Sequence, residues 1–334
     1  MARAPNSARS SAARDEIRGD ALKIFTVISL ISALVHAPIT PAQTSTRSAK
    51  TEEPTLESVL ALKDPSLPGK VVTYYTHGYE NRARLIQAFL SEERDFYARE
   101  LNIQLALTVA VLDAKQWERL NILDPYGVPT VTDFPPYVAL LPANWSQNHL
   151  GMLPPPSQSD PALVRRVHAA GRGWSDIFYQ GFDAIIGHEF GHAAARTYGI
   201  RPPTHWFDEF LATYFEIAFV RQRREDLQFP VEIFFAINRN YPHPYTSLSD
   251  FESRYPLSNT SPTNYAWYQA MFEQRIEQVY SEQGIEFLRE VREIFPADKP
   301  QTLSNSAVLE QLERICPGFI AWSRMLETTV PTQQ

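Results

Sequence analysis

One five-residue stretch constrains the fold of this chain more than any other part of its sequence. It reads His188, Glu189, Phe190, Gly191 and His192. If the stretch is helical, the step from one histidine to the other turns the chain by about 400°, so both imidazoles leave the helix in nearly the same direction. Two such histidines can bind one metal ion, and the glutamate beside them can act as a base. The pattern therefore predicts a helix that carries part of a metal site.

This helix is expected to begin near Ser175, which can cap its start, and to end at Gly199. The side chains around the motif are mostly apolar, so the helix is expected to be largely buried. Buried histidine and glutamate side chains need polar partners. Two structural histidines bonded to their neighbours are the alternative to a metal site, but that arrangement would bury three polar groups without gain.

Composition limits both the class of protein and the kind of metal site. The chain has 334 residues, 44% of them hydrophobic, which is typical of a soluble globular protein with one large domain or two small ones. Its 31 basic and 38 acidic residues give a net charge of -7, so we expect no nucleic acid partner. The single cysteine, Cys316, excludes an intrachain disulfide and a multi-thiolate zinc site, and is expected in the core. Metal ligands must therefore be histidines and carboxylates.

The N-terminus resembles an export signal. An apolar run of 14 residues, Ile24 to Ala37, is shorter than the roughly 20 residues that a membrane span needs. We expect residues 1–42 to be a signal peptide that is cleaved after Ala42, and residues 43–59 to be a flexible lead-in. The mature protein would then be exported, to the periplasm or the extracellular space, without a stable membrane span. The alternative is an uncleaved signal anchor that tethers it to a membrane.

The remaining sequence predicts an α+β fold with a small mixed sheet. Strands are expected at residues 71–75, 103–112 and 137–141, and residues 80–101 have the apolar spacing of an amphipathic helix that packs on them. After a proline-rich loop the pattern becomes helical. Further helices are expected at residues 161–171, 206–224, 264–283, 285–295 and 307–315. One domain, residues 60–334, is thus predicted, with a sheet-containing half (60–199) and a helical half (200–334).

A catalytic zinc ion needs a third protein ligand and an open fourth position. The positions three and six residues after His192 are Ala195 and Tyr198, which excludes the metzincin arrangement of glycine and histidine. The next helix instead begins with acidic residues, and its Glu209 lies 17 positions beyond His192.

The His-Glu-x-x-His helix, the loop after it, and the segment Trp206-x-x-Glu209-x-x-Ala212-x-Tyr214 together resemble the gluzincin metallopeptidases. More narrowly, they resemble the peptidase MA-like group, related to thermolysin and to the aminopeptidase N type. The resemblance spans roughly residues 70–295. It implies a zincin-like fold, Zn²⁺ as cofactor, His188, His192 and Glu209 as its ligands, and Glu189 as the general base.

The same resemblance implies further roles for which several residues are alternatives. Thermolysin-type enzymes place an acid four residues after the ligand glutamate to orient one histidine. That position is Thr213 here, with Asp208 and Glu216 as alternatives. A donor to the oxyanion is also needed. The candidates are His243, in a loop that would equally suit an aromatic surface turn, and Tyr265 and Tyr268, whose helical spacing would equally suit the core.

These features predict a zinc-dependent peptidase acting on peptides or proteins. The Gly-x-Met-Glu-Asn sequence with which related aminopeptidases bind a substrate amine is absent, which favours an endopeptidase. Two alternatives remain at this point. One is a non-catalytic, zinc-stabilised peptide-binding module, and the other is a metal hydrolase that acts on a non-peptide substrate.

Overall fold

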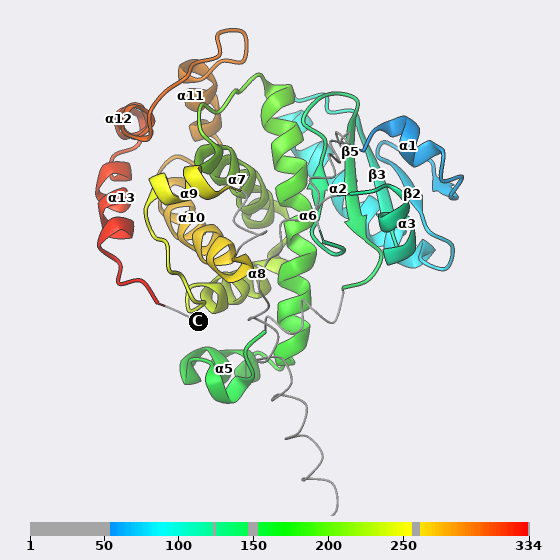
Figure 1. Ribbon diagram of the computed structural model, residues 1–334, viewed down its shortest axis with the longest axis horizontal. Helices are drawn as coiled ribbons and strands as arrows, with labels where there is room; N and C mark the ends of the chain where they lie inside the picture. The colour runs from blue at the N-terminus through cyan, green and yellow to red at the C-terminus, as the bar shows by residue number, and fades with distance from the viewer. Residues whose placement is uncertain (1–53, 123–124, 146–152, 256–260, 333–334) are drawn as a thin grey trace, which may run out of the picture. The chain divides into compact units, whose positions relative to one another are not determined.

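Five short strands form one mixed sheet in the first part of the described chain (Figure 1). In spatial order they are β1 (Ser66–Leu67), β2 (Val72–Tyr75), β3 (Leu107–Leu112), β5 (Tyr137–Pro142) and β4 (Thr130–Val131). The three central strands run parallel, and the two edge strands pair antiparallel with their neighbours. The small mixed sheet is therefore confirmed. The strand predicted from residue 103 begins later, at Leu107, and the edge strands were not predicted.

The structure is a computed structural model that describes residues 54–122, 125–145, 153–255 and 261–332. The predicted signal peptide (1–42) and most of the predicted lead-in lie outside these ranges. The described end of the lead-in is a short helix, α1 (Leu56–Leu60), capped by Thr55 through a hydrogen bond from the backbone of Ser58. The folded part thus begins before residue 60. Among the described residues, no helix is both long and apolar enough to cross a membrane.

Helices cover both faces of the sheet. The side chains of its central strand alternate between the two faces, so each face has apolar groups to bury. Val109 and Val111 of β3 belong to the main core together with the buried face of α2 (Glu80–Glu100). Ala110 and Leu112 point to a smaller core with α1 and with α3 (Ala114–Arg119). The predicted amphipathic helix is therefore confirmed, and it packs on the sheet as expected.

After β5, every described element is helical. These elements are the short 3-10 turn η2 (Pro156–Gln158), α5 (Pro161–Ala169), α6 (Trp174–Tyr198), α7 (His205–Arg223), α8 (Glu225–Asn238), α9 (Leu248–Arg254), α10 (Pro262–Gln283), α11 (Glu286–Ile294), α12 (Asn305–Ile315) and α13 (Phe319–Thr328). The predicted helices are confirmed with ends within two residues, whereas α8, α9 and α13 were not predicted. Cys316 is buried, as expected.

The long helix α6 contacts both the sheet and the helical part (Figure 1). Its start differs from the prediction, since Gly173 rather than Ser175 is the N-cap and no side chain caps it. Its end agrees, because Gly199 has a φ of 88°, a left-handed conformation that glycine adopts easily.

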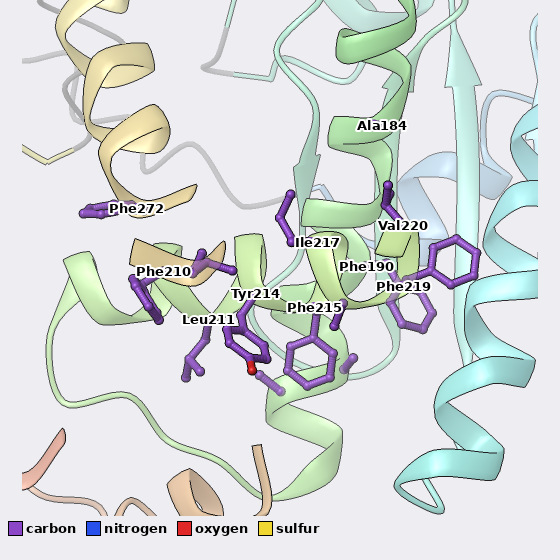
Figure 2. Close-up of a cluster of buried hydrophobic side chains, with 14 of the residues drawn as sticks. Ala184, Phe190, Phe210, Leu211, Tyr214, Phe215, Ile217, Phe219, Val220 and Phe272 are labelled. Carbon is purple, nitrogen blue, oxygen red and sulfur yellow. The ribbon is translucent and has the colours of Figure 1, made fainter. Parts of the chain in front are cut away.

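The helix α7 is buried on nearly all sides, although it carries the polar residues Glu209, Thr213 and Glu216. Figure 2 shows the packing: Phe210, Tyr214 and Phe215 of α7 lie in one buried cluster with Phe190 of α6 and Phe272 of α10. The same cluster continues to the rest of the main core. This packing fixes α7 against the helix that carries the two motif histidines.

Candidate metal site

The helices α6 and α7 bring three ligating side chains together: His188, His192 and Glu209. The Nε2 atom of His188 lies 3.2 Å from Nε2 of His192 and 3.0 Å from Oε2 of Glu209. Nε2 of His192 lies 3.8 Å from Oε1 of Glu209. In a tetrahedral site with metal–ligand distances near 2.0 to 2.1 Å, two ligand atoms are about 3.3 to 3.4 Å apart. Measured to one or the other oxygen of Glu209, these separations lie on both sides of that value, so the three predicted ligands are close enough together to hold one metal ion.

Thr213 orients His188. Its Oγ1 lies 3.1 Å from Nδ1 of His188, and it can donate its single proton to Oε1 of Gln269, at 2.9 Å, or to the Glu209 carbonyl, at 3.0 Å. The Thr213 hydroxyl must then accept a hydrogen bond from the imidazole, so Nδ1 of His188 carries the proton. The lone pair of Nε2 is left facing the Glu209 carboxylate, where a metal ion could bind.

Asp208 lies beside the other histidine. Its Oδ2 is 3.4 Å from Nδ1 of His192, a separation of an ion pair rather than of a hydrogen bond. Burial alone would lower the pKa of His192, but the charges of Asp208, Glu209 and Glu189 outweigh it and raise the pKa to about 9. His192 therefore holds an extra proton in a metal-free site, and a bound cation would replace that proton.

Three donors hold the Glu209 carboxylate in place. The Tyr255 hydroxyl donates to Oε1 at 2.6 Å, while the Tyr265 hydroxyl and Nε2 of Gln269 donate to Oε2 at 2.7 and 2.8 Å. Although burial raises the pKa of Glu209, the neighbouring imidazoles of His188 and His192 and the hydrogen bond from Tyr255 lower it well below its usual range. Glu209 is thus an anion. Oε1, which accepts from one donor only, has an acceptor position left for a cation.

Glu189 lies in the same cavity as the three ligands and is 9% exposed. Burial raises its pKa, and the nearby histidines only partly oppose that effect. A carboxyl whose pKa is moved toward neutrality is better suited to accept and return a proton than a fully solvated one.

The cavity around the site has a volume of about 890 Å³. The segment Val128 to Phe134, which contains the edge strand β4, forms part of its wall. Aromatic side chains of α6 and α8, among them Phe182 and Phe234, line another part, and charged groups such as Arg196 and Asp208 line a third. The site therefore faces a space within the size range of ligand-binding pockets.

The structure does not bring every predicted residue to the site. His243 is buried rather than on a surface turn, stacks on Trp267 with ring centroids 4.5 Å apart, and uses Nδ1 toward the Tyr241 carbonyl. The Tyr268 hydroxyl donates to the Ser247 carbonyl. Neither residue lines the cavity.

Glu216 lines the cavity, but no hydrogen bond joins its carboxyl to either motif histidine, so it does not orient them. Asp208 and Thr213, the other two candidates, lie against Nδ1 of His192 and of His188.

Two residues at the site were not predicted from the sequence, Tyr255 and Gln269. Gln269 lies one helical turn after Tyr265 on α10, so the shared face of that helix was a usable signal. Tyr255 directly follows α9, and no periodicity marks it.

Comparison of the chain with protein-family models, with curated proteins and with solved structures finds no match. What the site does must therefore be argued from its own geometry and chemistry.

Proposed function

We propose that this protein is a zinc-dependent endopeptidase of the gluzincin type, in which Glu189 is the general base. The observation that supports this most is the spacing of 3.0 to 3.8 Å between the ligand atoms of His188, His192 and Glu209, with Glu189 in the same cavity. Two histidines and one carboxylate form the donor set of catalytic zinc sites, which keep one position open. When bound, zinc would supply a Lewis acid and lower the pKa of a coordinated water.

Two side chains would act on the reacting atoms. Glu189 would take a proton from the attacking water and return it to the leaving amine nitrogen, a role that its raised pKa supports. Tyr255 is the best candidate for the donor to the developing oxyanion, because it lines the cavity and its hydroxyl lies beside the ligand Glu209; its single proton would turn from Oε1 of Glu209 to the substrate oxygen. Tyr265 stays a second candidate, bonded to the other oxygen.

A peptide substrate is favoured by the edge strand β4. It pairs with β5 on one side only, as the last strand of the sheet, and it belongs to the cavity wall. An extended peptide can add to such a free edge through its main chain and thereby lie across the site. Export, proposed from the N-terminal sequence, would expose the enzyme to extracytoplasmic proteins.

The proposal is tested with the purified mature chain and its Glu189→Gln variant. We expect about one zinc per chain in both proteins, because Glu189 is not a ligand. Hydrolysis of a peptide library should fall by at least about 100-fold in the variant, since general-base catalysis is lost. Unchanged hydrolysis by Glu189→Gln would contradict the mechanism. A zinc-loaded protein that cleaves no peptide would indicate a binding module, and cleavage of esters alone would indicate a different substrate class.

A further inference from the structure

Two buried carboxyl groups beside the metal site have oxygens that find no hydrogen-bonding partner among the described residues. Glu93, on α2, is completely buried, and neither of its oxygens has a partner. Glu216, on α7, is 2% exposed, and its Oε1 has none. An ionised carboxylate in such surroundings is costly unless a cation or donors compensate it, so these groups are expected to bind something.

The two side chains meet at Gly187 of α6. A β-carbon at this position would lie 3.3 and 3.4 Å from the two oxygens of Glu93 and 3.5 Å from Cγ of Glu216. Since both side chains come this close to one point, they lie side by side in the space that glycine leaves open. The pair thus connects α2, which packs on the sheet, with α6 and α7 of the helical part.

No cation from the neighbouring elements compensates the pair. The charges that act on Glu216 are those of His188 and Glu189, both on α6, and the charge that acts on Glu93 is that of Glu216. On α2 itself, the Tyr97 hydroxyl donates to the Phe215 carbonyl. Of the strands packed on α2, β3 has no ionisable side chain and β2 has only tyrosines.

The ionisable groups on the other helices around α7 have partners elsewhere. Glu273 and Glu277 of α10 pair with Arg239 and Arg221, and Glu252 of α9 pairs with His205. A metal ion is also a poor occupant, because the three-residue group of His188, His192 and Glu209 is the only one that the described residues offer for a metal. A proton remains as the species that two adjacent carboxyls can hold without further ligands.

We propose that Glu93 and Glu216 form a proton-binding site at Gly187, between α2 and α7, in which the buried pair holds at least one proton at neutral pH. Burial and the charge of Glu216 raise the pKa of Glu93 well above its usual value, and burial raises the pKa of Glu216 to about 7. Above that pH the pair approaches two adjacent anions, which weakens the contact between the sheet and the metal-binding helices. The stability of the protein is therefore linked to pH through this site.

The sign of this linkage follows from proton numbers. A carboxyl with a raised pKa in the folded state binds more protons there than in the unfolded state, so folding is favoured at low pH. The stability that the protonated Glu216 contributes to the folded state is fully present below about pH 4.5 and is lost as the pH rises through about 7. For one proton, the unfolding equilibrium constant should rise about tenfold for each pH unit in that window.

The test is denaturant unfolding of the full mature chain between pH 5 and 9, at one fixed zinc concentration. Wild type is compared with Glu93→Gln, Glu216→Gln and the control Glu92→Gln, a half-buried neighbour on α2 whose Oε1 lies 3.8 Å from Nε of Arg223. In each variant of the pair, the unfolding equilibrium constant should rise about tenfold less per pH unit than in wild type. The reason is that the new amide cannot titrate, although it can still donate a hydrogen bond. The control should keep the wild-type slope.

Infrared spectroscopy gives a second readout that needs no unfolding. The carbonyl stretch of a protonated, buried carboxylic acid should be present in wild type near pH 6, and the difference spectrum against either pair variant should show its loss. If Glu93→Gln does not fold, the comparison of wild type with Glu216→Gln serves as the test. Equal pH slopes in all four proteins, or a wild-type spectrum without this difference, would overturn the proposal. Neither readout depends on hydrolysis, so the result is independent of the proposed enzyme function.

Discussion

At the scale of single residues, Gln269 links the two ligands that lie on different helices. Its Oε1 accepts from Thr213, which orients His188, and its Nε2 donates to Oε2 of Glu209. One amide therefore holds both Thr213, which orients the ligand His188, and the ligand Glu209. It accepts a hydrogen bond through its oxygen and donates one through its nitrogen. Partners of this kind determine how well the ligands are positioned before an ion arrives.

We predict that Gln269→Leu lowers zinc affinity by about 10- to 100-fold, the usual effect of removing a group that orients metal ligands. Leucine can neither donate to Glu209 nor accept from Thr213. Competition against a chromophoric chelator measures the change. Gln278→Leu, an exposed position on the same helix that pairs with Arg275, is the matched control and should keep the wild-type affinity. Equal affinities for wild type and Gln269→Leu would show that the ligands are positioned without this amide.

A second prediction concerns the tyrosine hydroxyls. Tyr255→Phe should lose about 100- to 1000-fold in kcat, the usual cost of removing one donor to an oxyanion, when it is measured with zinc in excess. The excess is needed because the Tyr255 hydroxyl also donates to the ligand Glu209, so its loss should weaken zinc binding as well. Tyr268→Phe should leave kcat nearly unchanged, because that hydroxyl bonds to the Ser247 carbonyl outside the cavity. Peptide hydrolysis under saturating substrate separates the two. A Tyr255→Phe enzyme as fast as wild type would transfer the role to Tyr265 or to another donor.

At this scale the sequence was informative only where the site residues lie close together in the chain. The spacing of His188 and His192 indicated two ligands directly, and Glu209 followed from the resemblance of the next helix. Tyr255 and Gln269 reach Glu209 from 46 and 60 residues further on, so tertiary packing alone brings them to the site. Local periodicity contains no information about such distant contacts.

At the scale of the elements, two glycines allow α6 to lie close to its neighbours. A β-carbon at Gly191 would be 2.5 Å from the Ala212 carbonyl oxygen of α7, and one at Gly181 would be 2.4 Å from Cβ of Phe234 on α8. Real β-carbons do not approach other atoms so closely. The short distance from α6 to α7, on which the ligand geometry depends, therefore requires glycine within the motif itself.

We predict that Gly191→Ala destabilises the protein by about 3 kcal/mol, the upper part of the range for overpacking, because the atoms in the way belong to the backbone of α7. The gain in helix propensity, about 1 kcal/mol, does not offset this. Gly187→Ala is the matched control. Its new β-carbon would meet only side-chain atoms, those of Glu93 and Glu216, at 3.3 to 3.5 Å, so its loss of stability should be smaller than that of Gly191→Ala. Denaturant unfolding compares the two, and equal losses would contradict the close approach of α6 and α7.

Periodicity predicted the elements that have their own apolar pattern, and it failed for those that depend on neighbours. The helix α2 was predicted almost to the residue from its stripe of buried positions. The strand β4 has only two residues and is a strand because Thr130 and Val131 pair with β5. The helix α8 contains Pro230, which interrupts a helical pattern in sequence although buried packing maintains the helix in the fold.

At the scale of the whole molecule, the predicted α+β class is confirmed. No strand follows β5 in the described chain, so the helical part begins before residue 199. The fold class follows from the hydrophobic pattern, because the pattern shows which face of each helix and strand must be buried against another element. The place of the boundary depends on α6, which packs on both parts and belongs to neither alone.

A metal ion at the site would join α6 to α7 and, through Gln269 and Glu209, α10. A ligand that binds only the folded state stabilises it by an amount that depends on its concentration, about 2.7 kcal/mol at 100 times its Kd.

We therefore predict that excess zinc raises the free energy of unfolding of the wild type by about this amount over the chelator-treated protein. Glu209→Gln should lose most of the increment, because a neutral amide is a poor zinc ligand. Glu216→Gln should keep it, since Oε1 of Glu216 has no hydrogen-bond partner and so does not orient either motif histidine. The increment is the proper measure, because Glu209→Gln also disturbs the bonds from Tyr255 and Tyr265 and lowers stability without any metal. If zinc stabilised Glu209→Gln as much as the wild type, the third ligand would have to be another residue, and α7 would not take part in metal binding.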